Sequence, residues 1–198
     1  MKPSVTRGAV FVGLVGAGVA GRFLFRESIP NFTPTTALAL FAGFYFAHRL
    51  TALAVPLSIL LLSNLWLPAY LSRPEMAIIY AALVLPVLLG EWLKRTRNPV
   101  VVATAAMLPS FVFYLASNLA VWGFDKMYAH TLAGLALCYE CGLPFYKWML
   151  SGDLLFAGLV FGGYALTQAA VRSRIAAALA PALSQARLLP SPTQTHAG

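Results

Sequence analysis

A row of polar and aromatic residues recurs at every fourth position of one apolar stretch. Its members are Ser110, Tyr114, Asn118 and Trp122. Residues four apart share one face of a helix, and polar groups inside a membrane are costly unless they face the protein interior or a wet cavity. We therefore expect the row to point inward, with Asn118 hydrogen-bonding a ligand and Trp122 stacking on it. The alternative is interhelical hydrogen bonding with an interfacial tryptophan.

Further polar residues lie close to the ends of other apolar stretches. Asn31, between two prolines, suits a turn, a helix cap or a ligand contact, and Asp153 suits a helix N-cap or a ligand contact. Glu140 lies in an apolar run and needs a cation nearby, for which Lys126, Lys147 and Arg73 are candidates. The predicted substrate-binding residues are Asn31, Asn64, Asn118, Trp122, Tyr139, Glu140 and Asp153, and no catalytic residue is predicted.

Cys138 and Cys141 form a C-x-x-C pair. This spacing suits dithiol redox chemistry when the first sulfur lies at a helix N-terminus. A quinone-linked relay generally uses a second cysteine pair, which the sequence lacks, and the three histidines are poorly placed to complete a zinc site. The alternatives are therefore a thiol oxidoreductase, a cysteine that ligates a cofactor metal, or two small apolar residues on a buried face. No metal site is predicted.

The elements that must position these residues are membrane helices. Of the 198 residues, 60% are hydrophobic and 10% are charged, and the mean hydropathy is +0.76, whereas soluble domains carry about 25% charged residues. The apolar residues come in blocks about as long as a bilayer span, with most charges between them. The net charge of +8 therefore reflects membrane topology and not nucleic-acid binding. We predict an all-α integral membrane bundle of about six transmembrane helices.

The apolar blocks predict helices near residues 8–25, 35–48, 50–67, 75–93, 99–122 and 151–172. The stretch 128–147, which we expect to break at Pro144, lies in the interface, re-enters, extends a neighbour or forms a seventh span. We predict one transmembrane domain over residues 1–174 and a cytoplasmic, disordered tail over 175–198.

Basic residues give the bundle a direction. With six spans and the N-terminus inside, nine Lys and Arg residues fall on the inner side and five on the outer, a positive-inside bias. We therefore predict a multi-pass protein of the bacterial cytoplasmic (inner) membrane with both termini in the cytoplasm. A cleaved signal peptide in the first block is the alternative, disfavoured because its apolar run continues through Phe25.

Small residues form two lines at helical spacing in the first block. One line is Gly13, Ala17 and Gly21, and the next is Gly16 and Ala20. Such lines let two helix backbones approach closely. They predict packing inside this bundle or docking against another membrane subunit.

Three stretches resemble a known family. The first runs from GRF at 21–23 through PNFTP at 30–34 to ALALFAG at 37–43, and the second is SNLAVW at 117–122. The third begins with TLAGL at 131–135 and continues through LPF at 143–145 and GDLLF at 152–156 to FG at 161–162. Over most of residues 8–172 the chain resembles an uncharacterised bacterial membrane family of just under 200 residues. That family is similar in size and layout to the substrate-binding S components of energy-coupling-factor (ECF) vitamin transporters. This second likeness is one of fold.

The resemblance implies a six-helix bundle that binds a micronutrient near its outer face. It also implies docking, through small residues of the first helix, to a transmembrane coupling subunit driven by two ATPases. Some solitary members of that superfamily bind cobalamin through a cysteine, which makes a corrinoid a candidate ligand for Cys138 or Cys141; no resident cofactor is expected. The leading hypothesis is thus a micronutrient-binding protein for uptake, and the alternatives are a membrane thiol oxidoreductase and a non-catalytic assembly protein.

Overall fold

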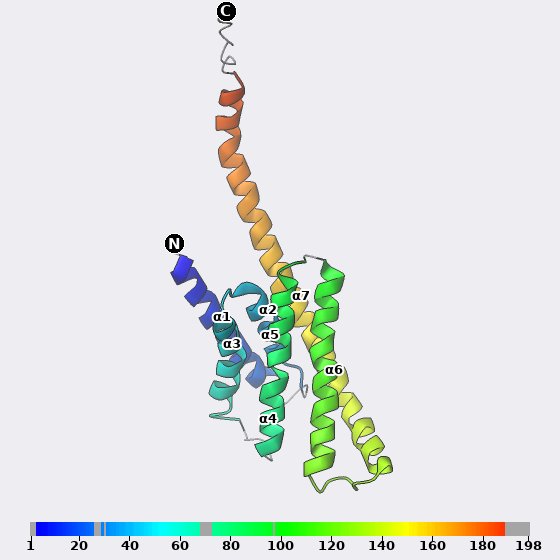
Figure 1. Ribbon diagram of the computed structural model, residues 1–198. Coiled ribbons are helices and arrows are strands. Elements are labelled where there is room, and N and C mark those ends of the chain that lie inside the picture. The colour runs from blue at the N-terminus through cyan, green and yellow to red at the C-terminus, as the bar shows by residue number, and fades with distance from the viewer. Residues whose placement is uncertain (1–2, 26–28, 30, 68–72, 97, 189–198) are drawn as a thin grey trace, which may run out of the picture. The chain divides into compact units, whose positions relative to one another are not determined.

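The structure is a computed structural model of the chain, and it describes residues 3–25, 29, 31–67, 73–96 and 98–188. The chain divides into two compact units, Met1–Val160 and Phe161–Gly198, each of which is described by itself. The described residues form helices and no strands (Figure 1). The predicted all-α class is therefore confirmed.

Seven helices cover most of the described residues. They are α1 (Pro3–Leu24), α2 (Thr35–Tyr45), α3 (Arg49–Ser63), α4 (Arg73–Ala82), α5 (Val84–Leu93), α6 (Pro99–Phe124) and α7 (Leu132–Leu188). Four apolar helical segments within this part of the chain are long enough to cross a membrane: Val5–Leu24, Met76–Leu93, Pro99–Phe124 and Leu132–Ala180. Helices α2 and α3 are apolar but shorter. This pattern indicates a membrane protein, as the composition predicted.

Helices α4 and α5 are two parts of one apolar segment, interrupted at Leu83. The interruption has a local cause in Pro86, which has no backbone N–H and whose ring crowds the carbonyl group four residues earlier, at Ala82. Helix α4 ends at that residue. Counted as one, α4 and α5 bring the apolar helical segments of the described chain to the predicted number of about six.

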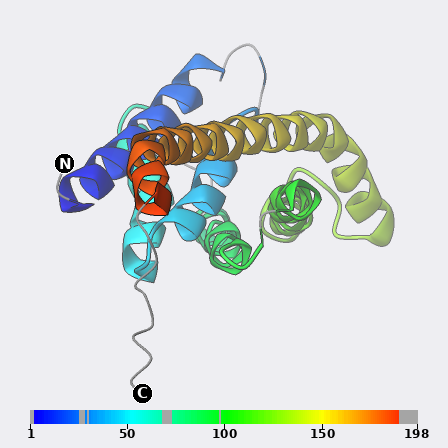
Figure 2. The same cartoon turned by 90° about the horizontal axis from the view of Figure 1, so that it is seen from above.

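Helix α2 is the buried helix of the first unit. Every residue from 37 to 43 is buried, as expected for a helix that is apolar all round. Two glycines let α2 and α5 touch: a Cβ on Gly43 would lie 2.0 Å from the Val87 carbonyl oxygen, and one on Gly90 would lie 1.9 Å from the Leu40 carbonyl oxygen. Figures 1 and 2 show the two helices side by side.

Helix α7 decides among the alternatives for residues 128–147. The helix begins at Leu132 and continues past Pro144, so this stretch extends the neighbouring apolar helix, as one alternative predicted, and the predicted break at Pro144 is wrong. Pro144 removes one backbone donor, opposite the Glu140 carbonyl group, and helices in membrane bundles tolerate such a loss because neighbouring groups adjust. For the same reason the last predicted helix does not begin near residue 151; its residues lie inside α7.

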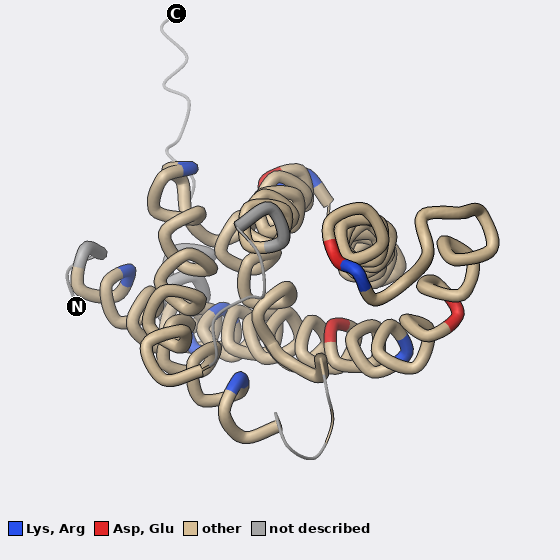
Figure 3. The backbone as a smooth tube through the Cα atoms, turned by 90° about the horizontal axis from the view of Figure 1, so that it is seen from below, with Lys and Arg blue, Asp and Glu red and all other residues tan. Residues whose placement is uncertain are grey.

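Charged groups meet at the end of the first unit where α6 begins. Arg49 Nε lies 2.8 Å from Glu91 Oε2, which joins α3 to α5. Lys94 Nζ donates to the carbonyl oxygen of the α2 C-cap residue at 2.7 Å. Most other charged positions lie apart from one another along the helices (Figure 3); Asp125 and Lys126 are neighbours just after α6. We name the end of the unit where α6 begins the Pro99 end.

The second unit contains the remainder of α7, from Phe161 to Leu188. Its described side chains, which extend to Ala180, are mostly exposed. The predicted boundary between residues 174 and 175 falls inside this helix, and residues 189–198 lie outside the described chain. The assignment of 175–198 as a cytoplasmic tail stays a prediction.

Candidate ligand-binding site

The polar row on α6 faces the first half of α7 and the loop before it. Three of its four members donate hydrogen bonds across this interface, so the row points inward as its spacing predicted. The bonds run from Ser110 Oγ to Asp153 Oδ2 (2.5 Å), from Tyr114 Oη to the Tyr139 carbonyl oxygen (2.7 Å) and from Trp122 Nε1 to the Ala129 carbonyl oxygen (2.9 Å).

Two tyrosines cross the α6–α7 interface in opposite directions. Tyr114 donates to the backbone of α7, and Tyr139 Oη donates back to the Leu115 carbonyl oxygen at 2.9 Å. Their rings meet edge to face, with centroids 5.5 Å apart. The pair therefore fixes the register of the two helices by side-chain-to-backbone bonds.

Asn118, the remaining member of the row, lies against Gly142 of α7. Its Nδ2 donates to the Tyr114 carbonyl oxygen at 2.8 Å, and Cys138 Sγ donates to the Asn118 carbonyl oxygen at 3.3 Å. A Cβ on Gly142 would lie 2.4 Å from Asn118 Oδ1, so the glycine makes room for the amide. An asparagine amide has two N–H donors, and only one of them bonds to a described residue.

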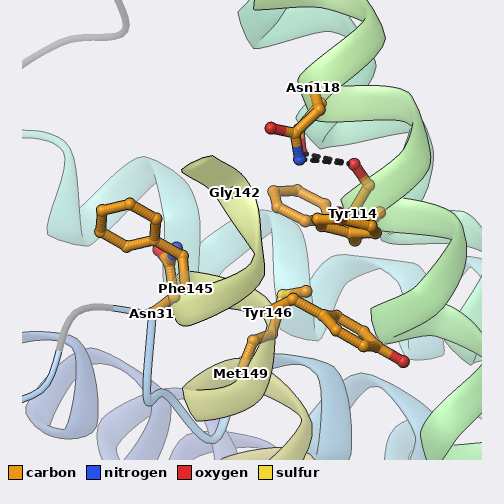
Figure 4. Close-up of a pocket in the computed structure, with 9 residues that line it drawn as sticks. Asn31, Tyr114, Asn118, Gly142, Phe145, Tyr146 and Met149 are labelled. Carbon is orange, nitrogen blue, oxygen red and sulfur yellow. Dashed lines mark hydrogen bonds between the residues drawn. The ribbon is translucent and has the colours of Figure 1, made fainter. Parts of the chain in front are cut away.

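A cavity of about 130 Å³ opens beside this amide. Figure 4 shows Tyr114 and Asn118 reaching it from α6, and Gly142, Phe145, Tyr146 and Met149 from α7. Its described lining consists of Asn31, Phe113, Tyr114, Ser117, Asn118, Gly142, Phe145, Tyr146 and Met149.

Asn31 brings a second amide to the cavity from the segment before α2. Its φ angle is 64°, in the left-handed region that asparagine tolerates better than most residues. Helix α2 has Pro34 as its N-cap residue, so Asn31 is a turn residue and not the cap. This backbone conformation places Asn31 at the edge of the cavity.

The lining suits an uncharged, partly planar molecule. Four of the nine lining residues are aromatic, five carry an amide or hydroxyl group (the two tyrosines belong to both sets), and none is charged. A few directional polar groups in an apolar wall are typical of small-molecule sites. The volume is smaller than the roughly 300 Å³ at the low end of such pockets, so the cavity as it stands fits a small ligand or one part of a larger one.

A family model describes nearly the whole chain. It is the "Family of unknown function (DUF6580)", and it matches residues 2–182. The chain belongs to this family. No curated protein and no solved structure matched the chain.

In this DUF6580 chain, the cavity brings together two of the seven predicted site residues, Asn31 and Asn118. Trp122 lies at the opposite end of α6 from Pro99, where its ring packs against His130 with centroids 5.6 Å apart. Tyr139 lies on α7 and serves the α6–α7 interface. Neither of the two lines the cavity.

Asn64 lies at the C-cap of α3 and has a different partner. Arg22 Nη2 donates to Asn64 Oδ1 at 3.2 Å. Arg22 Nε is buried and has no hydrogen-bond partner among the described residues. Asn64 therefore ties α3 to α1 and does not line the cavity.

Glu140 is exposed on α7. Among the described side chains it forms no ion pair with Lys126 or Lys147; the side chain of Arg73 lies outside the described residues. Among the described acids of the first unit, the buried one is instead Asp153, which is 1% exposed. Asp153 lies inside α7 and so caps no helix, and it lies one turn beyond Met149 of the cavity lining.

The cysteine pair does not meet the condition for dithiol chemistry stated above. Cys138 is the seventh residue of α7, nearly two turns from its N-terminus. Both thiols are free; Cys138 is buried against α6 and Cys141 is exposed, close to Tyr128. The geometry therefore favours a packing role for Cys138.

The small residues of α1 point in two directions. Gly21 lies against Pro34. The other four members of the two lines, Gly13, Gly16, Ala17 and Ala20, are exposed on the first unit. The glycine that packs against α3 is Gly18, where a Cβ would lie 2.3 Å from Ile59 Cδ1, and it belongs to neither line.

Six lining residues were not predicted, namely Phe113, Ser117, Gly142, Phe145, Tyr146 and Met149. Those on α7 recur at the three- and four-residue spacing of one helix face. That signal was available in the sequence, but it requires a helix that continues through Pro144.

Proposed function

We propose that this protein is a membrane substrate-binding protein of the ECF S-component type, which captures a small, uncharged, micronutrient-like molecule for uptake. The observation that carries the proposal is the cavity between α6 and α7, with two amides at its edge and aromatic walls. Asn118 retains an N–H group that no described residue accepts, and it would donate to a carbonyl or ring nitrogen of the ligand. The rings of Tyr114 and Tyr146 would hold a planar group.

The orientation of the bundle supports capture from outside the cell. If the N-terminus lies in the cytoplasm, as the distribution of Lys and Arg favours, the Pro99 end is cytoplasmic. The cavity then opens in the outer half of the bilayer of a bacterial inner membrane. A binding site there meets a scarce external solute before the cytoplasm does.

The exposed face of α1 supports a membrane partner. Gly13, Gly16, Ala17 and Ala20 leave a strip of this helix without bulky side chains, and such strips favour close helix–helix association in membranes. A transmembrane coupling subunit with ATPases would supply energy for release. The cavity volume disfavours a corrinoid in this conformation, because a macrocycle of that size needs far more room than 130 Å³.

The proposal is tested by ligand binding to the detergent-purified protein. A vitamin panel is screened by thermal shift, and mass spectrometry identifies any small molecule that copurifies. The informative variant is Asn31→Gly, because glycine accepts the φ of 64° and only the amide is lost. Ser151→Ala is the matched control, because Ser151 is exposed and bonds only to the Lys147 carbonyl group on α7.

We expect one compound to stabilise the wild type and the control, and its affinity to fall about tenfold, equivalent to about 1.4 kcal/mol, in Asn31→Gly. Stabilisation by no micronutrient, together with no copurifying ATPase, would refute the proposal. Equal binding by Asn31→Gly and the wild type would place the ligand elsewhere in the bundle.

A further inference from the structure

The N-terminus of α2 lies halfway along α6. Ser110 of α6 donates a hydrogen bond to Asp153 on α7, and the hydroxyl group of Thr36, the second residue of α2, lies beside the same carboxyl group. Ser110 is about 17 Å from the start of α6 and about 21 Å from its end at 1.5 Å per residue. The three side chains therefore meet near the middle of a span that is long enough to cross the roughly 30 Å hydrocarbon core.

The Asp153 carboxyl group is 1% exposed and forms no ion pair with a described side chain. The polar side chains beside it in the described chain are Ser110 and Thr36. Arg22, the basic residue of the outer part of α1, bonds to Asn64, and Tyr114, one turn from Ser110, donates to α7 at Tyr139. An ionisable group inside a membrane bundle is a functional candidate by default.

Ser110 has two acceptors for a single hydrogen. Its Oγ lies 2.5 Å from Asp153 Oδ2 and 3.4 Å from the Ala106 carbonyl oxygen. When Asp153 is ionised, Ser110 donates to it. When Asp153 is protonated, Ser110 turns its hydrogen to Ala106 and accepts the new O–H bond from Asp153. In each state Ser110 and Asp153 stay hydrogen-bonded to one another, in opposite directions, so either state can exist in the same backbone.

Two opposing influences act on the carboxyl. Removal from water favours the neutral acid, whereas the N-terminus of α2, with its unpaired N–H groups and partial positive charge, favours the carboxylate. A metal ion needs several ligands, and the described residues include no group of three or more His, Cys, Asp or Glu side chains that could hold one, whereas a proton needs only the carboxylate. A proton is therefore the ligand that fits this site.

We propose that Asp153 reversibly binds a proton at the middle of the bundle, with Ser110 reversing its hydrogen bond between the two states. The step is H⁺ plus carboxylate giving carboxylic acid, and no other bond is made or broken except hydrogen bonds. The cavity lies about one helical turn away, because Tyr114 and Met149 of its lining are four residues from Ser110 and Asp153, respectively.

The proposal is tested by a pH titration of the full-length, ligand-free protein in detergent, followed by infrared difference spectroscopy. The signal to follow is the C=O stretching band of a protonated carboxylic acid. Asp153→Asn preserves shape and removes this group, and Glu140→Gln removes an exposed acid from the same helix as the matched control. Ser110→Ala keeps the acid and removes one donor, and it carries the test if Asp153→Asn fails to fold.

We expect a carboxylic acid band that grows as the pH falls, shifts in D₂O, disappears in Asp153→Asn and persists in Glu140→Gln. In Ser110→Ala the band should remain, with its midpoint moved to higher pH because the carboxylate has lost a donor. A band that Asp153→Asn leaves unchanged, or one that does not vary over the whole pH range, would overturn the proposal. An unchanged midpoint in Ser110→Ala would overturn the role of Ser110. Because no ligand is present, a failed vitamin screen leaves this test intact.

Discussion

The α2–α5 crossing and the α6–α7 interface hold helices together in different ways. At the first, Gly43 and Gly90 bring each backbone against a carbonyl oxygen of the other helix, and the surrounding residues are apolar and buried. At the second, side chains donate to backbone and side-chain acceptors across the gap, and a cavity of about 130 Å³ remains. One contact depends on the absence of side chains, and the other depends on their presence.

The difference separates support from recognition. Backbone-to-backbone packing leaves no room for adjustment, because protein interiors are close-packed and even one added methyl group disturbs the packing. Side-chain hydrogen bonds contribute only about 1 kcal/mol each, and a bond to a ligand can replace them. The α2–α5 pair therefore serves as a rigid frame, and the α6–α7 pair as the wall that can respond to a bound molecule.

The largest effect is expected from Gly90→Ala. Its methyl group would lie 1.9 Å from the Leu40 carbonyl oxygen, and backbone cannot move aside as a side chain can. We expect the free energy of unfolding in detergent to fall by about 3 kcal/mol. Gly16→Ala is the control, because nothing lies within 4 Å of its Cβ position. If both variants denature at the same temperature, the close crossing is not a determinant of stability.

A smaller effect on stability, but a clear one on binding, is expected from Gly142→Ala. Here the added methyl group meets the end of the Asn118 side chain, which can rotate away. We expect the affinity for the ligand found in the vitamin screen to fall about tenfold, or about 1.4 kcal/mol. Gly158→Ala on the same helix has open space around its Cβ position and should bind normally. Loss of stability without loss of affinity would assign Gly142 to the frame.

Tyr114→Phe tests the hydrogen bonds of the α6–α7 wall directly. It removes the donor to the Tyr139 carbonyl oxygen and should lower the free energy of unfolding by about 1 kcal/mol. Tyr139→Phe removes the returning bond, which is exposed, and should cost less. Chemical denaturation of the two variants compares the two sides of the pair, and the reverse order would contradict the assignment.

The smallest effect concerns Tyr128, in the loop between α6 and α7. A hydrogen bond to Cys141 raises the pKa of Tyr128 above its ordinary value of 10.0. A raised pKa means that the folded protein holds the proton more tightly, so the bond contributes below pH 10 and is lost as the pH rises through the raised pKa.

We expect Tyr128→Phe to speed alkylation of the exposed Cys141 a few-fold at pH 8, with no change at the buried Cys138. The alkylation rate of Cys141 in the wild type should approach the rate in the variant only at more alkaline pH. Equal rates at pH 8 would show that the bond does not shield the thiol.

Features that depend on local spacing could be predicted from the sequence. The α6 row was predicted to face inward because positions four apart share a face in any helix, and its partners confirm this. The α7 lining was missed because Pro144 is a helix breaker in water, whereas in this bundle the helix continues.

Features that depend on packing between distant segments could not be predicted. Nothing near Asp153 in the sequence indicates that Thr36 begins a helix at the same depth. In α1, both faces are apolar, and in a membrane the lipid side is as apolar as the interior. The sequence therefore could not show that Gly18 would pack inward while Gly16 stays exposed.

The short length of α2 has a consequence for biogenesis. At 11 residues, α2 is well below the roughly 20 that an insertion machinery accepts as a span, and it leaves the ribosome before α5 is made. We expect α2 to enter the bilayer as a hairpin with α3. Until α5 is inserted, the face of α2 that contains Gly43 lacks its packing partner. Completion of the core then depends on the arrival of Gly90, so truncated chains that end before α5 should be targets for membrane quality-control proteases.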